Sequence, residues 1–206
     1  AVHDAEIAFF GETSEDVPAN LEKGIFGFAR ETAEMLCEAV ELGRAEGLGL
    51  GEAIGAYIGR KSAPNRDVSI FYQAYRLDIP VTVHIGIGTD IVNQHGEFDG
   101  ASWGELSHRD FRIFAGRIEG IGRRGGVVIN AGSAVILPEV LLKAVSIGRN
   151  MGASFSSLTT CNIDMIQHYR PRENVLARPS AFGGTSISLT GHHEILIPLI
   201  YSALLS

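Results

Sequence analysis

Two adjacent histidines followed by a glutamate, in the stretch GHHEILIPLI, are the residues near the end of the chain best suited to chemistry. The apolar run after them predicts a final helix that begins here. Because successive helical residues point about 100° apart, His192 and His193 cannot both face one ligand. We expect one of them to contact a cofactor or substrate. In a purely structural alternative, Thr190 or Gly191 caps the helix and Glu194 complements its dipole.

Two further candidate sites follow predicted strands. The stretch NAGSAV contains Gly132 and Ser133, and small residues at a strand end let the backbone approach a phosphate. A simple tight turn explains the same residues. The stretch HYRPRENV places charged residues in a predicted loop, where Glu173 is expected to face a ligand, oriented by Arg170 or Arg172. A solvated loop with local ion pairs is the alternative.

A metal site is a third possibility. His84, Asp90 and His95 follow an apolar run, and one of the final histidines could join them as ligands. Their spacing matches no standard zinc pattern.

The elements that position these residues follow from hydrophobic periodicity. Helical spacing dominates from about residue 21 to 58, and Asp67 or Ser69 is expected to cap the next helix. Apolar, β-branched runs then predict parallel strands at 80–85, 126–130 and 155–161, with helices between them. The fold class is therefore α/β, a Rossmann-like three-layer parallel sheet with a helical N-terminal part. We treat residues 1–206 as one domain that is incomplete at its N-terminus.

Composition excludes several classes of protein. The net charge of -7 argues against nucleic acid or an anionic membrane as partner. No apolar run approaches the roughly 20 residues that span a bilayer. Two cysteines predict neither a disulfide framework nor a zinc knuckle. These features are typical of a cytoplasmic protein.

The order of these segments resembles deoxyhypusine synthase and its relatives, an NAD-binding α/β family. The resemblance is carried by AVHDAEIAFFG, SIFYQAYRLDIPV, GTDIV, GVVINAGSAV, RPRENV and HEILIPLI, in that order along most of the chain. It implies NAD as the cofactor, a small cationic metabolite as the substrate, and a homo-oligomer with sites near subunit interfaces.

The resemblance also implies roles for individual residues. It makes Asp4, Asp90 and Glu173 candidates for holding a cationic amine, and it places both final histidines beside the cofactor. Sorted by role, the catalytic candidates are Asp90, Glu173 and His192, and the cofactor-binding candidates are Asp4, Gly132, Ser133, Thr160 and His193.

The chain departs from the family at two points. The family's lysine, which forms a covalent imine, has no counterpart, because Pro179 stands at about that place and no lysine follows Lys143. Leu137 and Pro138 replace the family's histidine pair. Without the nucleophile, deoxyhypusine synthesis is not expected.

Three functions follow from these observations. The first is an NAD-dependent enzyme that oxidises or rearranges a small amine-bearing metabolite, a polyamine or an amino acid, without a covalent lysine. An amino-acid substrate is also indicated by AVHDAE, which is similar to a segment of archaeal-type ornithine cyclodeaminases. The second is a catalytically silent nucleotide-binding protein. The third is a metal-dependent hydrolase that uses the histidine and aspartate cluster.

Overall fold

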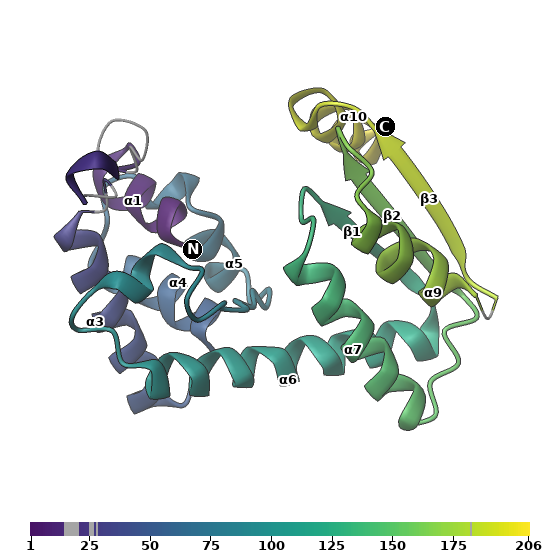
Figure 1. The fold of residues 1–206 in the computed structure, drawn as a ribbon, viewed down its shortest axis with the longest axis horizontal. Coiled ribbons are helices and arrows are strands. Elements are labelled where there is room, and N and C mark those ends of the chain that lie inside the picture. Colours follow the sequence, from purple (N-terminus) through teal and green to yellow (C-terminus); the bar gives the residue numbers. More distant parts are fainter. Residues whose placement is uncertain (15–20, 25–26, 28, 182) are drawn as a thin grey trace. The chain divides into compact units, whose positions relative to one another are not determined.

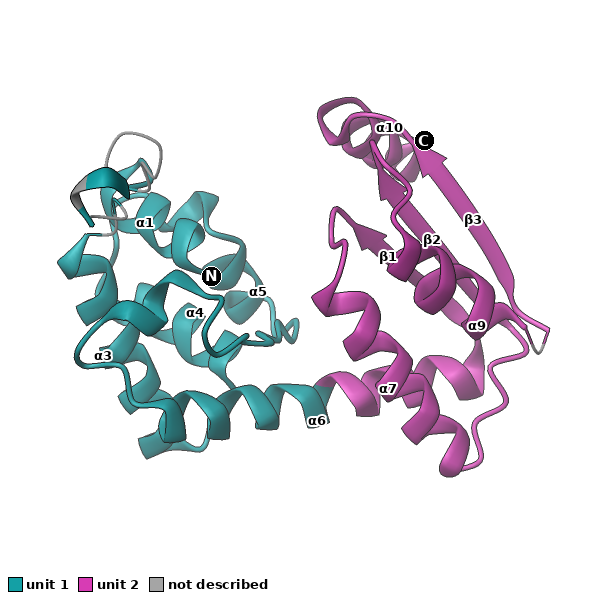
Figure 2. Ribbon diagram, in the orientation of Figure 1, with its two compact units in different colours: residues 1–113 teal, residues 114–206 magenta. Residues whose placement is uncertain are grey.

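The structure is a computed structural model that describes residues 1–14, 21–24, 27, 29–181 and 183–206. The chain divides into two compact units, Ala1–Ile113 and Phe114–Ser206, coloured separately in Figure 2. Each unit is described below by itself. None of the described helices combines the length and the apolar character that crossing a bilayer requires.

The regular elements in the described part of unit 1 are all helices, as predicted for the N-terminal portion (Figure 1). Ser69 caps α5 by accepting a hydrogen bond from the Tyr72 amide, which confirms one of the two predicted caps. The elements are α1 (Val2–Phe10), η1 (Leu21–Lys23), α3 (Arg30–Glu46), α4 (Leu50–Arg60), η2 (Arg66–Val68), α5 (Ile70–Arg76), η3 (Ile91–Gln94) and the first half of α6 (Gly100–Arg124).

The predicted strand at 80–85 does not form. This segment has no regular secondary structure, and its backbone forms hydrogen bonds to side chains of α6 instead of to another strand. The Val83 amide donates to Asp110 Oδ2 (2.7 Å), and the Ile85 amide donates to Ser107 Oγ (3.2 Å). The Ser107 hydroxyl in turn donates to the Val83 carbonyl. Because α6 satisfies these backbone groups, the segment needs no strand partner.

Asp110 also joins this segment to α4. Its Oδ2 atom accepts a second hydrogen bond, from the Gly51 amide at 2.9 Å, and the whole residue is buried. Gly51 lies so close to this segment that a Cβ atom there would meet the Val81 carbonyl oxygen at 2.0 Å. A buried carboxylate and a glycine therefore fix the position of 80–85 in unit 1.

Unit 2 is an α/β unit with a three-stranded parallel sheet in the order β1-β2-β3. Strand β2 is buried along its length, while β1 and β3 are the two edges. The elements after α6 are β1 (Gly126–Ala131), α7 (Ile136–Asn150), β2 (Leu158–Asp164), α8 (Tyr169–Pro171), the π-helix η4 (Arg172–Ala177), α9 (Arg178–Ser180), β3 (Thr185–Thr190) and α10 (His193–Leu205).

The sequence predicts two of these strands. The strand at 126–130 is confirmed, and the one at 155–161 lies three residues further along the chain, as β2. The predicted loop HYRPRENV is wrong, because 169–180 is helical, and Pro171 is tolerated there since it lies in the first turn. The third strand is β3, in a stretch where the sequence predicted no strand.

One face of the sheet packs against helices. Leu158 and Val128 on this covered face join a hydrophobic cluster with residues of α6, α7 and η4, including Leu141, Val145 and Val175. Side chains of alternate residues point to the opposite face. There Val127, Ile129 and Ile187 are 59%, 51% and 43% exposed. The sheet of unit 2 therefore presents one covered face and one open apolar face.

Candidate functional site

The carboxyl edge of the sheet in unit 2 brings together a glycine, a carbonyl and a histidine. Gly132 directly follows β1 and has φ +71°, a backbone conformation that favours glycine. The Ile163 carbonyl at the end of β2 accepts hydrogen bonds from the Gly132 amide (3.1 Å) and from His193 Nε2 (3.0 Å). A Cβ atom at Gly132 would lie 3.3 Å from His193 Cε1. Two predicted cofactor-binding residues, Gly132 and His193, are thus in contact.

Four consecutive backbone amides lie beside this contact. The amides of 133–136, between Gly132 and the start of α7, form no hydrogen bond to any other residue that the structure describes. Ser133 contributes in another way, because its Oγ accepts from the Leu137 amide in the first turn of α7. Free amides at a helix start attract anions. The predicted phosphate site at NAGSAV therefore has the necessary donors.

A chain of three side-chain amides supports this edge; two of them, Asn130 and Asn162, are buried, and the sequence did not predict the chain. Asn130 Nδ2 donates to the Ser133 carbonyl and to Asn162 Oδ1 at 2.7 Å. Asn162 Nδ2 donates to Gln167 Oε1 at 2.7 Å, and Gln167 Nε2 donates to the Leu189 carbonyl. The three amides thereby link the ends of all three strands. The available signal was an asparagine directly after a predicted strand, as Asn162 follows 155–161.

The two final histidines have different surroundings. The His192 backbone is the N-cap of α10 and its side chain is exposed, whereas His193 is half-buried against Gly132. The predicted cap at Thr190 or Gly191 is wrong, because the Gly191 amide donates to the Asp164 carbonyl and the helix begins two residues later. Glu194 lies in the first turn, as predicted.

Thr160 is not brought to this edge. It lies in the middle of β2, paired with Val128 and Ser186, and is completely buried. Its hydroxyl has no hydrogen-bond partner among the described residues. Its predicted role beside the cofactor stays a prediction.

Glu173 lies in η4, where it lines a pocket of about 450 Å³ between this π-helix and β3. Arg172 lines the same pocket, whereas the Arg170 guanidinium lies 3.6 Å from the Glu139 carboxylate. Of the two arginines predicted to orient Glu173, Arg172 therefore shares its pocket.

Asp90 belongs to unit 1. Its Oδ2 atom accepts from the Gly86 amide (2.7 Å), and it lines a pocket of about 290 Å³ with His84 and Trp103. Burial lowers the pKa of His84, which favours a neutral imidazole. His95 Nδ1 accepts from the Glu97 amide. In the described ranges, no group of three or more histidine, cysteine, aspartate or glutamate residues could hold a metal ion.

Asp4, also in unit 1, is engaged at the start of α5. Its carboxylate accepts from Ser69 Oγ at 2.6 Å and from the Ile70 amide at 2.7 Å. The side chain therefore acts as a helix cap supplied from a distant part of the chain. Its predicted part in binding a cofactor or cation stays a prediction.

Replacing Asp4 with alanine should lower the free energy of unfolding by about 1 kcal/mol, the usual effect of losing a helix cap. Asp67→Ala is the matched control, since it removes the same charge from an exposed position whose side chain makes no hydrogen bond to the described residues. Urea titration of both variants measures the difference. Equal losses in the two variants would contradict the capping role.

No protein-family model, no curated protein and no solved structure matches this chain.

Proposed function

We propose that the protein binds NAD at the carboxyl edge of its sheet, in a Rossmann-like manner, and uses it to oxidise or rearrange a small amine-bearing metabolite. The observation that carries the proposal is the run of four free amides at 133–136, directly after Gly132 and before α7. The sequence resemblance to the deoxyhypusine synthase family supports NAD as the nucleotide.

The free amides suit a pyrophosphate for electrostatic reasons. They lie at the start of a 15-residue helix, whose dipole places partial positive charge at this end. Gly132 lets the backbone turn sharply and approach a ligand, because no Cβ atom stands in the way. In open parallel sheets, ligands bind beyond the carboxyl ends of the strands. Both the location of these amides and their capacity to donate hydrogen bonds are therefore those expected of a pyrophosphate site.

His193 is the side chain best placed to contact the bound nucleotide. Its Nε2 atom donates to the Ile163 carbonyl, which fixes the proton on Nε2 in the neutral ring. The Nδ1 atom then remains as an acceptor, and among the described residues it has no hydrogen-bond partner. We assign this atom to the cofactor.

The chemistry rests on a hydride acceptor and on acidic residues that hold an amine. NAD supplies the hydride acceptor when it is bound. The carboxylate of Glu173 would hold the substrate cation. His192, exposed at the start of α10, would take up the proton that leaves the substrate. A covalent imine plays no part.

Calorimetric titration with NAD tests the proposal. His193→Gln preserves a donor toward the Ile163 carbonyl but removes Nδ1, so NAD affinity should fall about tenfold, equivalent to one hydrogen bond. His192→Gln is the matched control and should leave NAD affinity unchanged. Hydride transfer to NAD with a panel of amines then separates an enzyme from a silent binding protein. A parent protein that binds no NAD would refute both.

We also propose that the protein associates with copies of itself through α10. All 13 residues of this helix are described, and none is buried. Residues 195–205 include no charged side chain, and Ile197 and Leu204 are 52% and 79% exposed. A helix that is apolar all round is normally buried. A second copy offers the same uncharged surface in return.

The double variant Ile197→Glu/Leu204→Glu should therefore be monomeric at concentrations where the parent associates, because charges would be buried in the interface. Val68→Glu, which adds a charge at an exposed apolar residue of unit 1, is the control and should associate like the parent. Sedimentation velocity measures all three. Contacts of this kind commonly have dissociation constants of about 1 μM. A parent that is still monomeric at a protein concentration of about 100 μM would contradict the proposal.

A further inference from the structure

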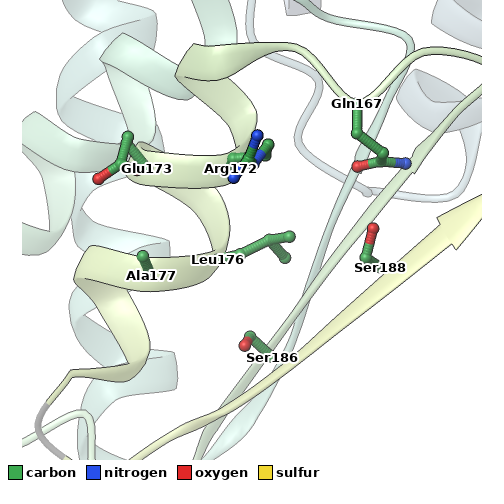
Figure 3. A pocket seen from close by; sticks show the side chains of 7 residues that line it. All are labelled: Gln167, Arg172, Glu173, Leu176, Ala177, Ser186 and Ser188. Atoms are coloured by element: carbon green, nitrogen blue, oxygen red, sulfur yellow. The ribbon is translucent and has the colours of Figure 1, made fainter.

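The pocket between η4 and β3 has features that the proposed function does not yet explain. It has a volume of about 450 Å³ and lies wholly within unit 2. In Figure 3, Arg172 stands between Glu173 on one side and Gln167 on the other, with Ser186 and Ser188 on the strand below. The pocket thus contains one acidic and one basic side chain together with two hydroxyl groups.

The helix that forms one wall is a π-helix. Segments of this kind are rare and occur frequently at functional sites. Here η4 places Arg172, Glu173 and Leu176 along the pocket. Val175 of the same segment is completely buried in the hydrophobic cluster under the sheet, which fixes the helix in place.

The charged groups of this pocket are available for a ligand. Neither Arg172 nor Glu173 forms an ion pair or a side-chain hydrogen bond with another described residue. The neighbouring arginines differ, because Arg170 pairs with Glu139, and Arg178 donates to Asn174 Oδ1 at 2.7 Å.

The other polar side chains of the pocket differ in whether they already form hydrogen bonds. The hydroxyls of Ser186 and Ser188 also make no hydrogen bond within the part of the chain that the structure describes. Both ends of the Gln167 amide are engaged, with Asn162 and with the Leu189 carbonyl. Gln167 therefore lines the pocket in a position that its hydrogen bonds hold in place. The donors that remain available to a ligand are Arg172 and the two serine hydroxyls.

We propose that this pocket binds a small zwitterion of the amino-acid class, with its carboxylate on Arg172 and the two serine hydroxyls and its ammonium group on Glu173. A guanidinium and hydroxyl groups recognise carboxylates, and a carboxylate recognises an ammonium group. Arg172 repels a second positive charge, so a diamine fits the pocket less well. The inference rests on the proposed function and narrows the amine-bearing metabolite to one that also bears a carboxylate.

Three probes of similar length test this charge pattern: 4-aminobutanoate, 1,4-diaminobutane and butanoate, each titrated calorimetrically into the full chain. The parent should bind 4-aminobutanoate at least tenfold more tightly than either of the others. Arg172→Gln should weaken 4-aminobutanoate about tenfold and strengthen 1,4-diaminobutane. Glu173→Gln should weaken 4-aminobutanoate and strengthen butanoate. Arg170→Gln, which removes an arginine that is already paired, should change none of these affinities.

The predicted gains are tighter binding of 1,4-diaminobutane by Arg172→Gln and of butanoate by Glu173→Gln. They distinguish a loss of recognition from structural damage, because a misfolded variant would not bind any of these probes more tightly. Tighter binding of 1,4-diaminobutane than of 4-aminobutanoate by the parent would overturn the inference, as would the absence of binding by all three. Unchanged selectivity in Arg172→Gln would overturn it too. Titration of the same variants with NAD tests the nucleotide site independently of this pocket. If NAD binds and 4-aminobutanoate does not, this inference fails and the proposed nucleotide site stands. If 4-aminobutanoate binds and NAD does not, only the nucleotide site is refuted.

Discussion

Asp110→Ala should lower the free energy of unfolding by about 2 kcal/mol, because it leaves two buried backbone amides without an acceptor. Asp110 is completely buried, and its Oδ2 atom accepts from Gly51 and Val83. The substitution also removes a buried charge, which offsets part of the loss. Urea titration at pH 7 measures the effect. A loss below about 0.5 kcal/mol, as at an ordinary surface position, would contradict this role.

The same residue predicts a pH dependence of definite sign. Burial raises the pKa of Asp110 to about 6, although hydrogen bonds from Val83 and Gly51 act in the opposite direction. Asp110 therefore binds its proton more tightly in the folded state than in the unfolded state. Its contribution to the free energy of unfolding is fully present below its unfolded pKa of 3.8. It is lost as the pH rises through about 6.

The control for this pH dependence is Asp110→Asn, which keeps an acceptor for the two amides but does not titrate. The difference in unfolding free energy between the parent and Asp110→Asn should shift against the parent as the pH rises from 4 to 7. Comparing the two proteins cancels other groups, such as Glu6. Burial disfavours the Glu6 carboxylate, but hydrogen bonds from Ser14, Thr13 and Thr32 outweigh burial and lower its pKa. A difference that does not vary with pH would refute the assignment.

Gly132→Ala should reduce both stability and NAD affinity. The positive φ of +71° disfavours any residue with a Cβ atom, at a cost of about 1 to 2 kcal/mol. The new methyl group would also lie 3.3 Å from His193 Cε1 and displace the ring from the cofactor. We expect NAD affinity to fall at least tenfold, as judged by calorimetry.

Gly152→Ala is a closely matched control for this variant. Gly152 has φ +86° in the same unit, and a Cβ atom there would meet nothing within 4 Å. It should lose similar stability and retain NAD affinity. If both variants lose NAD affinity equally, backbone strain explains the effect and the contact with His193 does not.

The sequence predicts the parallel sheet in part, for physical reasons that can be stated. A β-branched run between glycines identifies β1, since few other elements suit GGVVINAG. The run at 80–85 has the same texture, but periodicity cannot show that Asp110 and Ser107 satisfy its backbone. Strand β3 escapes prediction because TSISLT alternates small polar and apolar residues at a sheet edge, where a loop has a similar composition.

The candidate site is predictable to a similar extent. The 100° spacing on a helix correctly indicates that the two final histidines have different surroundings. It cannot tell which one faces Gly132, because that depends on where the Gly191 hydrogen bond to Asp164 places the start of α10. The sequence indicates Glu173 as a charged residue near a strand end, but its pocket depends on a π-helix that no sequence pattern indicates.

The most direct test of the central claim is the change in amide NMR chemical shifts when NAD is added to ¹⁵N-labelled protein. We expect the amides of 133–136 to shift most, together with those of Gly132 and His193, while the amides of α4 in unit 1 do not move. The Gly152→Ala variant should show the same pattern, and Gly132→Ala should require more NAD to reach it. The claim is contradicted if NAD at millimolar concentration shifts no amide, or if the largest shifts lie away from the carboxyl edge of the sheet.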